Sequence, residues 1–279
     1  MTVLLAGCGD LGTEVGLRFA ATGRRVLGLR RSPHGLPAEI VGQSVDLARE
    51  RPVVPADTDI VVVALTARRT AEAYRATYVG GLLNVVDALA DAGASPRIVY
   101  VSSTAVYGLS DGSWVDEDSP TEPRTETGKV LLEAEKVLRD RVSEAVVLRL
   151  AGIYGPGRGR VIEQVRTGAA TVPASASYTN RIHRDDAAAA IVHLATRVDC
   201  PQPVYVGVDD APTERAEVVR FLAGELGAPE PTIEHAASAL GANKRCRNSR
   251  LRQTGFELTY PTYREGYRAI LAGRGTSHR

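Results

Sequence analysis

The chain has 279 residues, of which 44% are hydrophobic and 24% are charged, and its formal net charge is +1. These values indicate a globular protein with one large or two unequal domains, and they exclude nucleic acid and anionic membrane surfaces as main partners. No apolar run reaches the roughly 20 residues that cross a bilayer, and the N-terminus lacks a signal-peptide pattern. The three cysteines are odd in number and widely spaced, which predicts reduced thiols and a cytoplasmic location.

The first predicted element is a short β-prone segment, residues 2–6, that runs directly into a glycine motif. The motif is Gly7-Cys8-Gly9-Asp10-Leu11-Gly12, which is GxGxxG, and residues 11–22 then read as a helix. A strand, a glycine turn and a helix in this order form the context of a dinucleotide-binding loop. The glycines allow a tight turn, close approach of a pyrophosphate and close helix packing, so we expect the pyrophosphate at the helix N-terminus.

The second predicted strand, residues 25–29, is followed by Arg30-Arg31-Ser32, and no acidic residue occurs in the range 22–38. An acidic side chain at this place binds the ribose hydroxyls of NAD, whereas a guanidinium matches a 2′-phosphate. The sequence therefore predicts NADP rather than NAD, with NAD as the less favoured cofactor. The alternative is a solvated arginine pair in an arginine-rich chain. Further on, Asp46 either accepts a hydrogen bond from the adenine amine or caps a short helix.

Strand-like and helix-like segments continue to alternate through the first two thirds of the chain. This alternation predicts an α/β fold with a Rossmann-type, doubly wound parallel sheet. The expected strands are 2–7, 25–29, 59–65, 97–103, 145–151 and 203–208, and the expected helices are 11–22, 70–92, 126–142 and 184–197.

The pattern changes near residue 155, where a run of glycines and Pro156 interrupts the regular elements. We expect residues 1–155 and 180–210 to form the nucleotide-binding domain. Residues 156–179 and 211–279 are expected to form a smaller, discontinuous C-terminal substrate region, short and irregular over its last part. Such a region lies over the carboxyl ends of the strands, where ligands bind in open α/β sheets.

Several motifs together resemble the extended short-chain dehydrogenase/reductase superfamily, in its NAD-dependent epimerase/dehydratase branch. They occur in the family's order and cover nearly the whole chain. Besides the glycine motif they are Val-Ser-Ser-Thr-Ala-Val-Tyr-Gly at 101–108, Lys129 followed by Glu133, Leu-Arg-Leu-Ala-Gly-Ile-Tyr-Gly-Pro-Gly at 148–157, Arg-Ile-His-Arg-Asp-Asp at 181–186, and Gly255-Phe256 with the segment 260–266.

The resemblance implies a mechanism and also a missing member. It implies that Ser103 hydrogen-bonds the reacting oxygen and that Lys129 contacts the nicotinamide ribose. The family's proton-transferring tyrosine stands four residues before that lysine, where this chain has Thr125. None of the three lysines of the chain follows a tyrosine at this spacing. Because this tyrosine is missing, we expect a degenerate proton-transfer site, which lacks its usual acid/base. Loss of a positioned acid/base slows a reaction by roughly 10²–10⁴-fold.

If turnover occurs, the substrate, a bound water or another phenol is expected to supply the proton. Tyr78 is the first candidate, because it aligns with a residue that approaches the family's active site, and Tyr107 and Tyr154 are further candidates. We expect no metal, since Asp185 and Asp186 precede an alanine-rich run and are placed to cap a helix. The complete set expected to contact the cofactor is Gly7, Gly9, Asp10, Leu11, Gly12, Arg30, Arg31, Ser32, Asp46, Leu47, Ala64, Leu65, Thr66, Lys129 and Ile153.

Two functions follow from these observations. The first is an NAD(P)-binding epimerase/dehydratase-like or reductase-like enzyme that acts on a nucleotide sugar or a related carbonyl or hydroxyl compound. The alternative is a non-catalytic NADP(H)-binding sensor or regulatory module. The intact glycine loop, Ser103 and Lys129 favour the enzyme, although a sensor must bind nucleotide too, and the missing tyrosine favours the sensor. The resemblance also implies a homodimer formed through the helices at 70–92 and 126–142.

Overall fold

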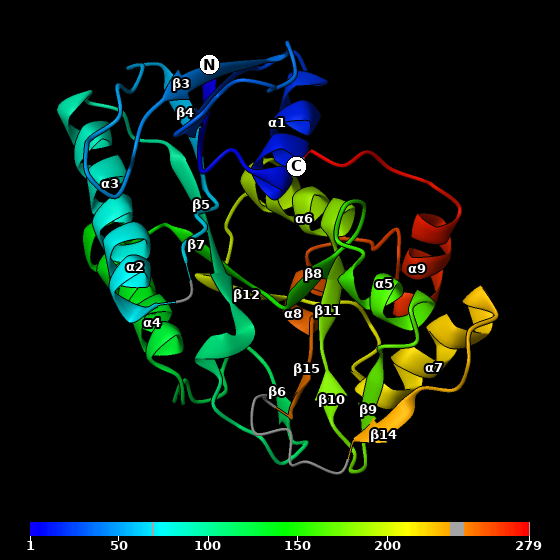
Figure 1. Ribbon diagram of the computed structural model, residues 1–279. Coiled ribbons are helices and arrows are strands. Elements are labelled where there is room, and N and C mark those ends of the chain that lie inside the picture. Colours follow the sequence, from blue (N-terminus) through cyan, green and yellow to red (C-terminus); the bar gives the residue numbers. More distant parts are fainter. Residues whose placement is uncertain (69, 235–242, 279) are drawn as a thin grey trace.

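The computed structural model describes residues 1–68, 70–234 and 243–278, and it is built around a seven-stranded parallel sheet (Figure 1). This confirms the predicted α/β, Rossmann-type architecture. The strand order is β12-β7-β5-β4-β1-β2-β3. Because the order reverses between β1 and β4, a crevice is expected at their carboxyl ends. The strands are β1 (Thr2–Ala6), β2 (Arg25–Arg30), β3 (Ile40–Ser44), β4 (Thr58–Val63), β5 (Arg97–Ser103), β7 (Val146–Leu150) and β12 (Val204–Gly207).

Helices cover both faces of the sheet (Figure 1). Successive residues of a strand point to opposite faces. Val3 and Leu5 accordingly pack in one apolar cluster with residues of α1 and α6, while Leu4 and Ala6 pack in another with residues of α3 and α4. The glycine loop, which follows β1 directly, is thus fixed between two packed layers. The helices are α1 (Asp10–Ala20), α3 (Gly81–Asp91), α4 (Glu126–Arg141) and α6 (Arg184–Thr196).

The expectation of a short, irregular segment after residue 211 was wrong. The segment contains α7 (Arg215–Leu226), α8 (Ser249–Gln253) and α9 (Tyr263–Leu271). Side chains of α7 and α9 share an apolar cluster with those of α5 (Arg160–Arg166), which is a core separate from the sheet. The start of α9 does carry a sequence signal, because Thr262 and Glu265 form a reciprocal capping box.

Short strand pairs connect the two parts of the molecule. β8 lies directly after the sheet strand β7 and pairs with β11, which leads into α6. The described residues include no helix that is long and apolar enough to cross a membrane. The remaining strands are β6 (Trp114–Val115), β8 (Gly152–Tyr154), β9 (Thr171–Pro173), β10 (Tyr178–Thr179), β11 (Arg181–His183), β13 (Thr213–Glu214), β14 (Thr232–Glu234) and β15 (Arg245–Cys246).

Candidate active site

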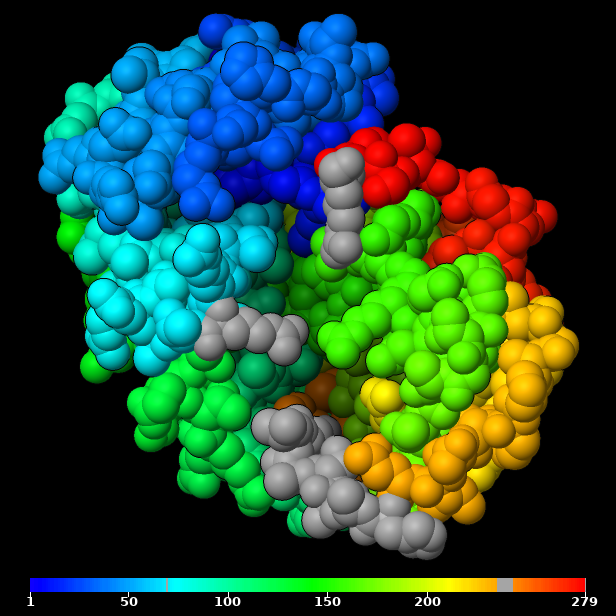
Figure 2. Space-filling model, in the orientation of Figure 1, coloured from blue at the N-terminus to red at the C-terminus, as the bar shows by residue number. Residues whose placement is uncertain are grey.

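A cleft of about 500 Å³ lies at the carboxyl ends of β1, β4, β5 and β7, and Figure 2 shows the molecule hollowed between its N-terminal segments and the later, green segments. Its position is the reversal point of the strand order, where open α/β sheets bind ligands. The lining comes from the glycine loop, the segment after β4, the end of β5, α4 and the segment 150–158. The lining residues are Gly9, Asp10, Leu11, Gly12, Ala64, Leu65, Thr66, Tyr74, Tyr78, Val101, Ser102, Ser103, Ala105, Thr127, Leu131, Leu150, Ala151, Ile153 and Arg158.

The three motif glycines have different steric surroundings. A Cβ at Gly7, where φ is +97°, would lie 2.4 Å from the Ala64 carbonyl oxygen, and one at Gly12 would lie 2.4 Å from the Gly7 carbonyl oxygen. These two positions therefore have to be glycine for the fold itself. A Cβ at Gly9 would meet nothing within 4 Å, so the space beside this residue is open. The loop thus fits a pyrophosphate that lies against the backbone at the start of α1.

Asp10, the first residue of α1, lies in the same loop and is held by two arginines. Its Oδ2 accepts from Arg158 Nε at 2.8 Å, and its Oδ1 accepts from Arg184 Nη1 at 3.0 Å. Burial alone would raise the pKa of this carboxyl, but the hydrogen bond from Arg158 and the charges of both arginines outweigh burial and lower the pKa. Asp10 is therefore ionised near neutral pH, and its charge is compensated.

The residues expected at the adenosine end lie after β2 and β3. Arg30 ends β2 close enough to the glycine loop that its charge opposes the burial that raises the pKa of Cys8. Arg31-Ser32 is exposed. Asp46 accepts from the backbone N–H of Ala48 at 3.2 Å in a turn over residues 47–49, and no helix follows it in the described residues before β4, so the helix-capping alternative was wrong. The backbone carbonyl of the buried Leu47 accepts from Asn84 at 2.8 Å.

Ser103 stands at the end of β5 with its hydroxyl in the cleft. Its Oγ accepts from the backbone N–H of Ala105 at 3.2 Å. The Oγ accepts this hydrogen bond through a lone pair, so the hydroxyl hydrogen can still be donated to a substrate oxygen. The structure therefore brings Ser103 into the same cleft as the glycine loop and the expected cofactor contacts Ala64-Leu65-Thr66 and Ile153.

Beneath the cleft floor lies a buried ionic network. Ser102 donates to Glu135, and the fully buried Glu135 forms an ion pair with Arg149 at 2.7 Å. Arg149 Nη1 also donates to the Tyr107 hydroxyl at 2.8 Å. Burial raises the pKa of Tyr107 to about 12, although the Arg149 charge acts in the opposite direction. Because Glu135 on α4 is bound by Ser102 of β5 and Arg149 of β7, it fixes the rotation of α4 about its axis relative to both strands.

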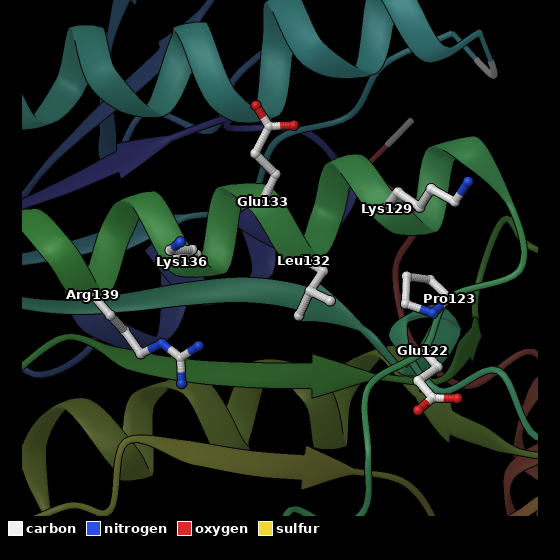
Figure 3. Close-up of a pocket in the computed structure, with 7 residues that line it drawn as sticks. All are labelled: Glu122, Pro123, Lys129, Leu132, Glu133, Lys136 and Arg139. Carbon is white, nitrogen blue, oxygen red and sulfur yellow. The ribbon is translucent and has the colours of Figure 1, made fainter.

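The face of α4 that meets the cleft is not the face that carries Lys129. Leu131 and Thr127, the residues four and eight positions before Glu135, line the cleft. Lys129 lies about 200° around the helix axis from Thr127. Its side chain is 58% exposed and its Nζ pairs with Glu126 at 2.7 Å. It lines a shallow hollow on the outer side of α4 with Leu132 and Lys136 (Figure 3).

The expected placement of Lys129 at the nicotinamide ribose was therefore wrong, as was that of Thr125 in the cleft. Thr125 is the N-cap of α4, and its hydroxyl accepts from the backbone N–H of Gly128 at 3.1 Å. Thr127 and Leu131 face the cleft instead. They are four residues apart, which is the spacing of the family's tyrosine and lysine. Both the phenol and the ammonium are thus absent from this face of α4. The buried Glu135 is the signal that identifies the inward face.

Two phenols from the other wall of the cleft do reach it. Tyr74 ends α2 (Ala71–Tyr74), and Tyr78 belongs to a π-helical segment, η1 (Arg75–Gly80), of the kind that often occurs at functional sites. Their ring centroids are 4.9 Å apart. Burial, with a smaller contribution from Tyr74, raises the pKa of Tyr78 to about 12. Tyr78 was expected from the sequence, whereas Tyr74, which lies one helical turn before it, was not.

The other tyrosine candidates do not line the cleft. Tyr107 is buried with its hydroxyl on Arg149, and Tyr154 is buried in the C-terminal core, 4.8 Å from Tyr267 between ring centroids. The cap of α6 is His183, whose Nδ1 accepts from the N–H of Asp185 at 3.2 Å, so the expected capping by the aspartates was wrong. Among the described residues no group of three or more His, Cys, Asp or Glu is arranged to hold a metal ion.

Comparison with known proteins gives matches over nearly the whole chain. The family described as "RmlD substrate binding domain" matches residues 1–274. Protein YeeZ of Escherichia coli K12 is 31% identical over 93% of this chain and 96% of its own length. A 3-diazoavenalumate denitrifying reductase of Streptomyces is 30% identical over 95% of this chain and 99% of its own length.

Solved structures agree with this result. A structure from Methylobacillus flagellatus, described as a candidate NAD-dependent epimerase/dehydratase, is 38% identical with a TM-score of 0.81, and 98% of each chain is covered. MoeE5 in complex with UDP-glucose and NAD is 22% identical over 95% of this chain and 96% of its own, with a TM-score of 0.81, which shows the same fold.

Proposed function

The chain belongs to the RmlD substrate binding domain family, within the extended short-chain dehydrogenase/reductase superfamily, and on that premise we propose that it is an NADPH-dependent reductase. Its substrate is a carbonyl compound or a comparably electrophilic molecule, with a nucleotide sugar as one possible class. The proposal rests on one observation: the cleft contains Tyr78, whose pKa burial raises to about 12, and neither Thr127 nor Leu131, the α4 residues that line the cleft, is an ammonium that could ionise it.

The protonation state of Tyr78 decides whether this residue can begin a reaction as an acid or as a base. Oxidation of an alcohol, with which an epimerase or a dehydratase of this type begins, requires a base to take the hydroxyl proton. A phenol with a pKa of about 12 is ionised to only about one part in 10⁵ at pH 7. Reduction of a carbonyl requires an acid, and a protonated phenol is an acid at every physiological pH. The cleft is therefore suited to reduction rather than to oxidation.

Each residue then has a role in the reduction of a carbonyl. Ser103 donates its hydroxyl hydrogen to the substrate oxygen and polarises the carbonyl. Tyr78 transfers a proton to the same oxygen as the C–O double bond becomes a single bond. When bound beside the glycine loop, NADPH would supply the hydride for the carbonyl carbon. The products are an alcohol, NADP⁺ and a tyrosinate that solvent reprotonates. The Streptomyces relative is named as a reductase, which supports this direction.

Substitution of Tyr78 tests this proposal. Tyr78→Phe is expected to lower kcat for NADPH oxidation by roughly 10²-fold, since a positioned acid is lost, and to leave the Kd for NADPH unchanged. Stopped-flow fluorescence with a panel of aldehydes, ketones and UDP-sugars measures both quantities. The wild-type rate is expected to show no ionisation of Tyr78 between pH 6 and pH 9, because its pKa lies near 12. Tyr74→Phe is the matched control variant. If Tyr78→Phe kept the full wild-type turnover, the assignment of Tyr78 as the acid would be contradicted.

Cofactor preference is tested at the end of β2. Removing both guanidinium groups with Arg30→Ala and Arg31→Ala is expected to weaken NADPH binding by roughly 10- to 100-fold, since charge-assisted hydrogen bonds to the 2′-phosphate are lost. NADH affinity is expected to stay the same. The control is Arg139→Ala, an exposed arginine on the outer side of α4. Equal loss of both affinities in calorimetric titrations would exclude 2′-phosphate recognition by this pair.

A non-catalytic NADP(H) sensor is the second candidate function. This function is favoured because Thr127 and Leu131 stand in the cleft at the spacing of the family's tyrosine and lysine. Neither residue offers an ionisable phenol or an ammonium. Binding of NADPH without consumption of any acceptor by the wild-type protein would support this candidate. Acceptor-dependent NADPH oxidation that falls on Tyr78→Phe would exclude it.

A further inference from the structure

Arg158 reaches the dinucleotide loop from the opposite wall of the cleft, and we propose that it clamps the pyrophosphate of the cofactor. This inference rests on the proposed function, because it requires that a dinucleotide occupies the cleft. Arg158 follows β8 in the segment that leads to α5, so it belongs to the part of the chain that borders the C-terminal core. Its guanidinium nevertheless lies at the start of α1 and lines the cleft.

The backbone before Arg158 is turned back toward the glycine loop. Gly155 and Gly157 have φ values of +149° and +73°, a conformation that favours glycine. The N–H of Arg158 donates to the carbonyl oxygen of Gly155 at 3.0 Å, which closes the turn. The conformation of this turn, and not only the length of the arginine side chain, therefore directs the guanidinium across the cleft.

The two arginines on Asp10 have unequal electrostatic surroundings. Arg184 is 1% exposed and is shared by three carboxylates: Asp10 at 3.0 Å, Glu14 at 3.5 Å and Asp185 at 2.7 Å. Its positive charge is thus fully compensated. Arg158 is 23% exposed, and within the described chain its guanidinium forms one ion pair, from Nε to Asp10. Its terminal nitrogens can therefore donate to a further anion.

The geometry favours a pyrophosphate as that anion. The open space beside Gly9 and the N-terminus of α1 lie at the same end of the cleft as Asp10. The carboxylate of Asp10 alone would repel a phosphate, whereas the Arg158–Asp10 ion pair is neutral and leaves the terminal N–H groups of Arg158 available to the cleft. A guanidinium held by Nε presents its two terminal N–H groups as a fork, which matches two phosphate oxygens. Asp10 thus positions Arg158, and Arg158 binds the phosphate.

Titration with cofactor fragments separates this clamp from the rest of the site. The probes are NADPH and ADP-ribose, which contain a pyrophosphate, and adenosine 2′-monophosphate, which has no phosphate at its 5′ position. Arg158→Met is expected to raise the Kd of the two pyrophosphate probes by roughly 10- to 100-fold, since one or two charge-assisted hydrogen bonds are lost. The Kd of the third probe, which lacks the pyrophosphate, is expected to stay within about twofold of the wild-type value. Arg158→Lys, which keeps the charge but not the fork, is expected to lie between Arg158→Met and the wild type. Arg160→Met, an exposed arginine two residues along the chain, is expected to change none of the three.

The possible outcomes are distinct. Equal effects of Arg158→Met on all three probes, or no effect on any, in protein with an unchanged Tm would overturn the clamp while leaving the nucleotide site intact. Failure of the folded wild-type protein to bind NADPH and ADP-ribose would overturn the proposed function itself. Selective loss for the two pyrophosphate probes supports the clamp.

Discussion

The double substitution Thr127→Tyr, Leu131→Lys is expected to raise the rate of alcohol oxidation with NADP⁺ by about 10²-fold, because it restores a positioned acid/base. Both positions face the cleft from α4, at the spacing of one helical turn. The ammonium is expected to lower the pKa of the introduced phenol below the usual value near 10. Absorbance titration at 295 nm, relative to Leu131→Lys alone, measures this pKa without any substrate.

The matched control for this experiment is Thr125→Tyr. It creates the family's motif in the sequence, because Lys129 follows four residues later, but it does so on the exposed side of α4. We expect no gain in oxidation and an introduced phenol that titrates as in water. A gain with Thr125→Tyr and none with the double variant would show that the inward face of α4 has been assigned to the wrong residues.

Gly9→Val is expected to abolish dinucleotide binding without unfolding the protein. A Cβ at this position meets nothing within 4 Å, so the added side chain extends into the open space that we propose for the pyrophosphate. Because Gly9 is the N-cap of α1 in an extended conformation, the free energy of unfolding should fall by no more than about 1 kcal/mol. The Kd for NADPH should rise by about 100-fold or more, since several charge-assisted hydrogen bonds are lost.

Gly12→Ala is the contrasting variant. Its Cβ would lie 2.4 Å from the backbone oxygen of Gly7, so the strand–turn–helix unit itself must shift. We expect a loss of about 2 kcal/mol or more in the free energy of unfolding, measured by urea denaturation. If Gly9→Val destabilised the protein as much as Gly12→Ala, or bound NADPH normally, the open space beside Gly9 would not be the phosphate site.

The parts of the fold that could be predicted are those with local periodic signals. The continuous apolar run at 61–65 and the glycine motif predicted the buried strand β4 and the β1–α1 turn. β3 was missed because four of its five residues are not buried, so it has no apolar run. α7 and α9 were missed because their apolar faces pack against each other in a separate core, which depends on contacts distant in sequence.

The residues of the candidate site also divide into those with a local sequence signal and those placed by contacts distant in sequence. Ser103, Tyr78 and the glycine loop follow from motifs with fixed positions in the chain, and the structure places them in one cleft. The rotation of α4 could not be derived from the spacing between Lys129 and Glu133, because it is determined by the buried pair of Glu135 with Arg149. The contact of Arg158 with Asp10 joins residues 148 positions apart, and no sequence period connects them.

The central claim is that the cleft beside the glycine loop binds a pyridine dinucleotide and prefers the phosphorylated, reduced form. Isothermal titration of the folded protein with NADPH, NADH and NADP⁺ tests it most directly. The account predicts binding of one NADPH per chain, weaker binding of NADH, and loss of the NADPH signal in Gly9→Val. Absence of heat with every pyridine dinucleotide, or tighter binding of NADH than of NADPH, would contradict it.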